Sequence, residues 1–219
     1  MSQLKGVLNQ LEDPTQYCKS CFKNIDEKSL LYLFKVKQKL CINCLFERKP
    51  IFKYFVLDGV KGLSIYYYNS KLRNEIYQFK GCYDIELGVT FLHPYEQELS
   101  LIYKGYIIIP MPSVKEDDEI RGFNHVCEIF SHLNLEIRPV LYKTKKVKQS
   151  DRKFKERKQI LKEIEIEKNI NLKDKNILLV DDIITTGNTL TAAIRIMRKQ
   201  QVKDIKILVL AMNKGNETK

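Results

Sequence analysis

The chain has 219 residues, 44% of them hydrophobic, which suits one medium domain with a small appendage and a real hydrophobic core. The net charge of +11 favours a polyanionic partner, nucleic acid first and an anionic membrane surface second, although solubility alone also explains it. No apolar run approaches the roughly 18–20 residues of a membrane span, and the stretch MSQLKGVLNQLEDP lacks an export-signal layout. We therefore expect a cytoplasmic protein with reduced cysteines, and a peripheral position at the inner face of the membrane stays open.

Four of the six cysteines form two Cys-x2-Cys motifs, Cys18-x2-Cys21 and Cys41-x2-Cys44, with nineteen residues between them. Each turn can aim two sulfurs at one point, and two turns complete a four-thiolate zinc site without an open position for water. We predict a structural zinc ribbon over residues 1–50, which depends on metal because so short a segment buries little apolar surface. Two disulfides or a catalytic Cys-x2-Cys pair are alternatives that the missing export signal and missing βαβ pattern disfavour.

Residues 51–219 begin with an aromatic-rich stretch from Phe52 to Tyr68, which predicts short strands broken at Asp58-Gly59 and at Gly62. The segment SKLRNEIYQFKG then predicts a helix that Ser70 caps and Gly81 ends. The buried face of this helix should carry Leu72, Ile76 and Phe79.

The run from Tyr106 to Ile109 shows no alternation and predicts a parallel strand buried on both faces, ended by Pro110-Met111-Pro112. A helix is expected in NHVCEIFSHLNL, and residues Leu135 to Leu141 predict one more strand. The inward positions of this helix are Val126, Ile129, Phe130 and Leu133.

The last part of the chain predicts a strand–loop–helix–strand unit. Residues Ile177 to Val180 should form a central parallel strand, and LTAAIRIMRKQ a helix. A final strand is expected from Ile205 to Leu210. The helix should bury Leu190, Ala193, Ile194 and Met197.

Two adjacent acids, Asp181 and Asp182, follow the central strand, where open α/β sheets bind their ligands. The next loop offers the hydroxyls of Thr185, Thr186 and Thr189, a tight turn at Gly187, and backbone N–H groups at a helix start that can hold an anion. Acids that accept hydrogen bonds from vicinal hydroxyls, beside a phosphate cradle, predict a sugar-phosphate ligand, with a divalent cation nearby to relieve the repulsion. Nucleotide-binding P-loop and Rossmann motifs do not fit the loop, and a phospho-receiver fold does not fit the short remaining chain. Two solvated aspartates that cap a helix are the structural alternative.

The segment VDDIITTGNTL is similar to the phosphoribosyl-pyrophosphate (PRPP) motif of type I phosphoribosyltransferases. Together with the four-cysteine ribbon, Ile109-Pro110-Met111-Pro112 and Arg121-Gly122-Phe123-Asn124, it makes the chain resemble the ComF family of competence proteins from Cys18 to about Leu210. The resemblance implies an α/β fold: a type I phosphoribosyltransferase-like parallel sheet flanked by helices, after a small zinc ribbon.

The resemblance also implies roles for individual residues. Asp181 and Asp182 would be the catalytic acids that face the ribose hydroxyls, with Mg²⁺ arriving with PRPP. The pyrophosphate turn after Ile109 has no basic residue until Lys115, so Arg121 is the nearest candidate in its motif to neutralise that group. Family members commonly read RGFNQ, and His125 replaces the glutamine here. The 5′-phosphate would be held by Thr185, Thr186, Gly187, Asn188 and Thr189.

A strongly basic segment runs from Lys143 to Lys162, with ten Lys or Arg residues against two acids. It predicts either a solvated loop and helix face or an arm that contacts phosphates. The candidate DNA-binding residues are Lys143, Lys145, Lys146, Lys148, Arg152, Lys153 and Lys155, and bases could stack on Tyr66, Tyr67 and Tyr68 or on Phe52 and Tyr54.

Two function hypotheses follow. The first, implied by the resemblance, is a competence protein for natural transformation that handles incoming single-stranded DNA beside a DEAD-type helicase and recombination-loading proteins. The second is an active phosphoribosyltransferase that passes the ribosyl group of Mg-PRPP to a nitrogen acceptor. A scaffold that contacts only protein partners through the ribbon is a third option.

Overall fold

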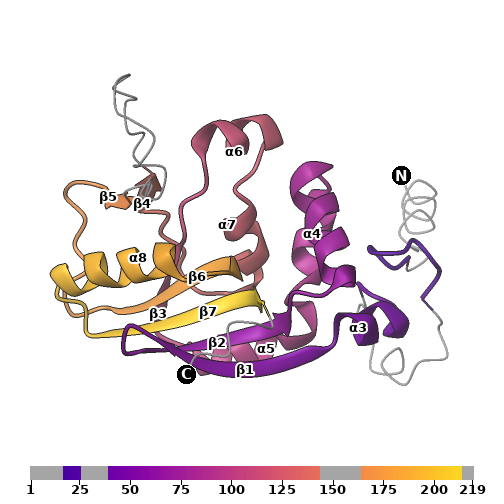
Figure 1. Ribbon diagram of the computed structural model, residues 1–219, viewed down its shortest axis with the longest axis horizontal. Helices are drawn as coiled ribbons and strands as arrows, with labels where there is room; N and C mark the ends of the chain where they lie inside the picture. Colours follow the sequence, from indigo (N-terminus) through magenta and orange to yellow (C-terminus); the bar gives the residue numbers. More distant parts are fainter. Residues whose placement is uncertain (1–16, 26–38, 144–163, 214–219) are drawn as a thin grey trace, which may run out of the picture. The chain divides into compact units, whose positions relative to one another are not determined.

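The computed structural model describes residues 17–25, 39–143 and 164–213 (Figure 1). The basic segment beyond Lys143 lies outside these residues up to Lys162. Contacts divide the chain into two compact units, Met1–Lys49 and Pro50–Lys219.

The first unit has a very small apolar core. Tyr17 and Asn24 form an isolated antiparallel bridge, and helix α3 (Ile42–Arg48) begins directly after Cys41. Its buried cluster within the described residues contains Cys18, Ile25, Leu40 and Cys44. Because two of these four residues are cysteines, apolar burial among the described residues contributes little stability to this unit.

The second unit is built on a five-stranded sheet in the order β1-β2-β7-β6-β3. The four strands β2, β7, β6 and β3 run parallel, and β1 pairs antiparallel with β2 (Figure 1). Their bounds are β1 (Pro50–Leu57), β2 (Val60–Tyr67), β3 (Tyr106–Pro110), β6 (Asn176–Ile184) and β7 (Asp204–Met212). A second, two-stranded sheet pairs β4 (Leu141–Lys143) with β5 (Ile164–Ile166).

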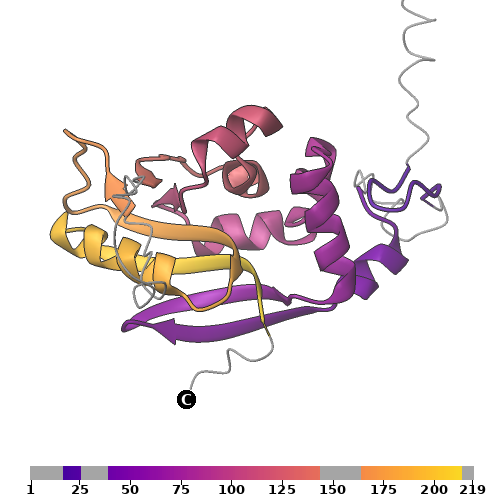
Figure 2. The same cartoon turned by 45° about the horizontal axis from the view of Figure 1, so that its top comes forward.

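Helices cover both faces of the large sheet (Figure 2). On one face, Leu178 and Val180 of β6 pack in a core cluster with α4 (Ser70–Gly81), α5 (Glu96–Ile102) and α7 (His125–Phe130). On the other face, Ile177 and Leu179 pack with α8 (Asn188–Lys199). Successive side chains of a strand point to opposite faces, so β6 is apolar on both sides up to Val180.

Short elements complete this unit. They are helix α6 (Lys115–Arg121) and the 3-10 turns η1 (Ile85–Thr90), η2 (His93–Tyr95) and η3 (Ser131–Leu133). Among the residues described in both units, no helix is long and apolar enough to cross a bilayer.

The predicted inward faces are confirmed, because every apolar residue assigned to the helices at 70–81, 125–133 and 188–199 is buried.

The residue that caps helix α4 differs from the prediction. Asn69, and not Ser70, is the N-cap residue, since its side chain accepts a hydrogen bond from the backbone N–H of Leu72 at 2.8 Å. Asparagine and serine serve equally well at this position, so only the tertiary structure separates them.

Two strand predictions are also corrected. The chain turns at Asp58-Gly59 as expected, but Gly62 does not break the strand and lies inside β2. Of Leu135 to Leu141, only an isolated bridge between Ile137 and Ile108 and the first residue of β4 form strand structure.

Gly62 is required by its cross-strand neighbour Phe55, whose ring covers it. A Cβ atom at residue 62 would lie 2.3 Å from the ring Cζ of Phe55. We therefore expect Gly62→Ala to lower the free energy of unfolding by about 1–3 kcal/mol, measured by urea denaturation. The control is the same substitution in a Phe55→Leu background, where the cost should shrink. An equal cost in both backgrounds would contradict this explanation.

Candidate functional site

The two adjacent acids lie near the carboxyl end of β6, which extends two residues beyond them to Ile184. Their neighbours in the sheet are β3 on one side and β7 on the other. The site therefore sits at the edge where parallel α/β sheets bind ligands.

Asp182 is engaged by two basic side chains from other elements. Its Oδ2 atom lies 2.5 Å from Nζ of Lys80 on α4 and 3.4 Å from Nε2 of His125 on α7. Its Oδ1 atom accepts a hydrogen bond from the backbone N–H of Ile183 at 2.7 Å. Burial by itself raises the pKa of an aspartate, but the His125 hydrogen bond and the Lys80 charge outweigh it and hold the pKa of Asp182 below its usual range.

Asp181 has a different environment although it is adjacent in sequence. It is half-buried, and its Oδ1 atom accepts the backbone N–H of Asp182 at 2.9 Å. Burial and the neighbouring Asp182 charge raise the pKa of Asp181 well above its usual value. A carboxylate under this repulsion gains most from hydroxyl donors or a cation supplied by a ligand.

The loop after β6 leads into α8 through Gly187, whose φ of 73° places it in the left-handed region. Thr185, Thr186, Asn188 and Thr189 are exposed, and the N-cap residue of α8 makes no side-chain capping hydrogen bond. The first N–H groups of a helix attract anions when no side chain caps them. The predicted phosphate loop is therefore exposed, and it leads into the start of helix α8, which attracts anions.

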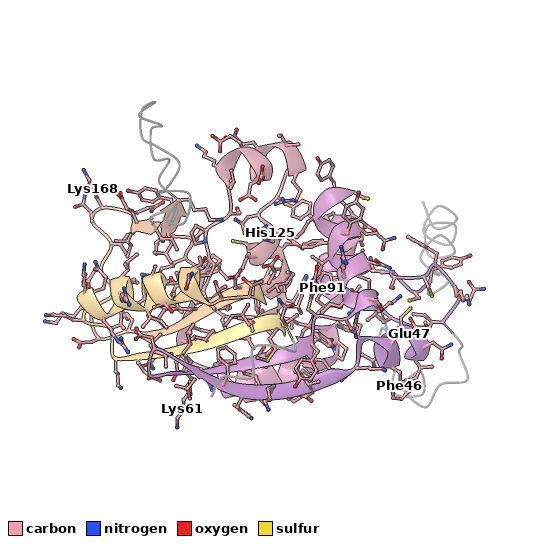
Figure 3. All side chains as sticks on the ribbon, viewed as in Figure 1. Phe46, Glu47, Lys61, Phe91, His125 and Lys168 are labelled. Carbon is pink, nitrogen blue, oxygen red and sulfur yellow. The ribbon has the colours of Figure 1, made fainter. Side chains whose placement is uncertain are left out.

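Arg121 is held inside the protein. Its side chain is 9% exposed, and its NH1 atom lies 2.9 Å from Oδ1 of Asp118 and 3.2 Å from Nδ1 of His125. Its Nε atom donates to the carbonyl of Lys80 at 3.1 Å. Asp118 also accepts hydrogen bonds from Asn124 and Ser113, so the RGFN segment forms one polar network with the end of α4. Figure 3 shows His125 on the side of the sheet that carries α4 and α7.

The predicted DNA-binding residues are described only in part. Lys143 lies in β4, whereas Lys145, Lys146, Lys148, Arg152, Lys153 and Lys155 lie outside the described residues, so their role stays a prediction. The stacking role suggested for Tyr66 is wrong, because its ring is fully buried and its hydroxyl donates to the carbonyl of Phe91 at 3.0 Å. Of the other aromatic candidates, Tyr54 is 74% exposed and Phe52 packs edge-on against Tyr95.

The four predicted metal ligands converge in the first unit. The Sγ atoms of Cys18, Cys21, Cys41 and Cys44 all lie within 4.8 Å of one another, and those of Cys21 and Cys41 are 3.7 Å apart. Tetrahedral Zn–S bonds of about 2.3 Å place sulfurs roughly 3.8 Å apart, so the cluster can hold a metal ion such as zinc. Burial raises the pKa of the Cys18 thiol, but backbone N–H groups of both cysteine turns outweigh it and lower the pKa to about 7. A thiolate at neutral pH is the form that binds metal.

Sequence reasoning did not find Lys80, Asp118 or the contact of His125 with Asp182. Lys80 follows Phe79 in a helix whose pattern shows only that Phe79 is buried, and 102 residues separate it from Asp182. A basic residue in the last turn of a helix usually interacts with its own carbonyls, so no local signal pointed to the acid pair.

Several known proteins are similar to this chain. The family model for the phosphoribosyl transferase domain matches residues 123–219. The competence protein ComFC of Bacillus subtilis is 28% identical over 81% of this chain and 85% of the relative. ComFC of Streptococcus pneumoniae is 26% identical over 88% of this chain and 84% of the relative. A hypoxanthine phosphoribosyltransferase from Staphylococcus aureus overlaps 60% of this chain and 66% of its own at 13% identity, with a TM-score of 0.39, which decides nothing about function.

The sheet, the helices on both its faces and the family match define a phosphoribosyltransferase-type domain, which here follows a four-cysteine cluster. The chain is a homologue of the ComFC competence proteins of Bacillus and Streptococcus.

The opposite pKa shifts of the two acids predict opposite effects on stability. Asp182→Asn should lower the free energy of unfolding at pH 7 by about 3–5 kcal/mol, because it leaves the Lys80 charge unpaired. Asp181→Asn should raise it by about 1 kcal/mol, because it removes a half-buried charge that Asp182 repels. Urea denaturation at several pH values measures both.

The pH dependence follows from the same shifts. The native pKa of Asp182 is lowered, so its stabilising effect is complete above the unfolded pKa of about 4 and is lost as pH falls towards the native value. The native pKa of Asp181 is raised, so its destabilising effect begins as pH rises through about 4, and the gain from Asp181→Asn should vanish below that pH. Equal effects of the two variants would contradict the assignment.

The cysteine cluster predicts one bound metal ion per chain. Cys41→Ser should abolish stoichiometric zinc and lower the melting temperature of the first unit, because three thiolates bind zinc more weakly than four and folding depends on the metal. Elemental analysis and a chelator titration measure this. Cys82→Ser, which changes an exposed cysteine outside the cluster, is the control and should leave the zinc content unchanged.

Proposed function

We propose that the acid pair and the loop after β6 bind a ribose phosphate of the PRPP type, in a competence protein that handles incoming single-stranded DNA. One observation carries the ligand assignment: a repelled carboxylate, Asp181, precedes an exposed threonine loop that leads into a helix whose N-cap residue is glycine. Vicinal hydroxyls satisfy the first feature and a 5′-phosphate satisfies the second. The phosphoribosyl transferase domain match supports the same ligand class.

The DNA-handling role is supported by the competence relatives and by the net charge of +11. In this role the protein acts in the cytoplasm beside a competence helicase and recombination-loading proteins, and the four-cysteine cluster holds structural zinc. Mg²⁺ accompanies PRPP, whose diphosphate supplies the oxygen ligands that this cation prefers.

A second candidate is an active phosphoribosyltransferase, which the domain match also favours. Asp181 then orients the ribose hydroxyls and stabilises the positive charge that develops on the ring as pyrophosphate leaves. Pyrophosphate release with a panel of nucleobases distinguishes transfer from binding alone.

Binding measurements with the full-length, zinc-loaded protein test the proposal. Mg-PRPP should bind the wild type, and Asp181→Asn should weaken this binding at least tenfold because a charged acceptor is lost. Binding of a labelled single-stranded oligonucleotide should fall steeply with salt and should be unaffected by Asp181→Asn.

Two controls separate the parts of the proposal. Asp204→Asn makes the same chemical change at the start of β7, at the opposite edge of the sheet, and should leave PRPP binding intact. Replacing Lys145, Lys146 and Lys148 with glutamine should weaken oligonucleotide binding and reduce its salt dependence. A wild type that binds no PRPP refutes the ligand assignment, and one that binds no oligonucleotide at low salt refutes the DNA role.

A further inference from the structure

A ribose phosphate that carries a second anionic group needs a cation at that end, and Arg121, the nearest candidate in its motif, is enclosed by other protein groups. Lys115 is on the exposed side of α6, with 88% of its side chain accessible and a weak contact of 3.9 Å to Glu119. Arg121 is only 9% exposed, and its guanidinium contacts Asp118, His125 and the carbonyl of Lys80. An arginine enclosed in this way positions its neighbours and does not face a ligand.

The contact between Arg121 and His125 selects one tautomer of the neutral imidazole ring. A guanidinium only donates hydrogen bonds, so Nδ1 of His125, 3.2 Å from Arg121 NH1, must accept. The proton of the neutral ring then lies on Nε2, which points at Oδ2 of Asp182 at 3.4 Å. Arg121 therefore orients His125 as a donor to Asp182.

Lys80 is the cation that this network leaves facing the site. Its Nζ atom lies 2.5 Å from Oδ2 of Asp182, while 32% of its side chain stays accessible. An ammonium group has three N–H donors, and Asp182 takes one of them. Both carboxylate oxygens of Asp182 are thus occupied by protein groups. Asp181, in contrast, forms no ion pair with a basic side chain within the described residues.

Lys80 and the phosphate loop belong to opposite faces of the sheet. Phe79, beside Lys80 on α4, packs in the core cluster that contains Leu178 and Val180. Leu190, near the start of α8, packs in the cluster on the other face. A ligand that lies across the end of β6 with its phosphate at the start of α8 therefore presents its other end to Lys80.

We propose that Lys80 binds the pyrophosphate group of the ligand, with Asp182, His125 and Arg121 as the residues that position it. This assignment rests on the proposed ribose-phosphate site and divides its binding surface: the loop takes the 5′-phosphate, Asp181 takes the hydroxyls and Lys80 takes the second anionic group. It makes the site specific for ligands with anionic groups at both ends.

Three probes test the division with the full-length, zinc-loaded protein: Mg-pyrophosphate, ribose 5-phosphate and Mg-PRPP, each titrated by calorimetry. Lys80→Gln should weaken pyrophosphate and PRPP at least tenfold, and ribose 5-phosphate less than twofold. Lys80→Arg should restore part of the loss. Lys61→Gln removes the same charge from the start of β2, at the opposite edge of the sheet, and is the matched control.

The outcomes separate this inference from the proposed function. Equal weakening of all three probes by Lys80→Gln means that the lysine only supports the fold, and unchanged pyrophosphate affinity also overturns the inference; the ribose-phosphate site survives both results. A wild type that binds neither ribose 5-phosphate nor PRPP refutes both proposals together.

A second measurement avoids substitution altogether, in case Lys80→Gln does not fold. Acylation of lysines in the wild type, followed by mass spectrometry, should show that Mg-pyrophosphate slows labelling of Lys80 and that ribose 5-phosphate does not. Labelling of Lys61 should be unaffected by either. Equal labelling of Lys80 with and without pyrophosphate would overturn the inference.

Discussion

The buried carboxylate of Asp182 is the constraint on which the candidate site depends. A charge 8% exposed at the end of an apolar strand is tolerated only with a partner, and Lys80 and His125 supply it. These partners come from α4 and α7, so the ion pair with Lys80 and the contact with His125 join two helices to the central strand. The helices that cover one face of the sheet are thereby held in register with the carboxyl end of β6.

The same constraint shifts the pKa values of the two neighbouring acids in opposite directions. Asp182 is neutralised inside the protein, and its pKa falls; Asp181 keeps the repulsion of that charge, and its pKa rises. The RGFN segment belongs to this arrangement, because Arg121 ties the end of α4 to α6 and α7 through Lys80, Asp118 and His125. The motif thus supports the site from its buried side, and in the proposed binding mode the groups that contact the ligand are Asp181, the threonine loop and Lys80.

The two units differ in how much apolar surface their described residues bury. The phosphoribosyltransferase-type domain has two large apolar clusters, one on each face of its sheet, whereas the described core of the first unit is four residues, two of them cysteines. Hydrophobic burial suffices for the domain, whereas the described residues of the smaller unit bury little apolar surface, and a metal ion held by the four cysteines would add stability there. ComFC relatives match this chain over more than four fifths of its length.

The sequence by itself determined the features that local chemistry encodes. The cysteine spacing predicted the converging sulfurs, the unbroken apolar run predicted the buried strand before Asp181, and helical periodicity predicted the inward faces of α4, α7 and α8, because these signals repeat within a few residues. Only the folded chain shows that Gly62 lies inside a strand beneath Phe55, that Lys80 neutralises Asp182, and that His125 contacts the same carboxylate. Those contacts join residues far apart in the chain, and no local pattern records which distant side chain will meet a buried charge.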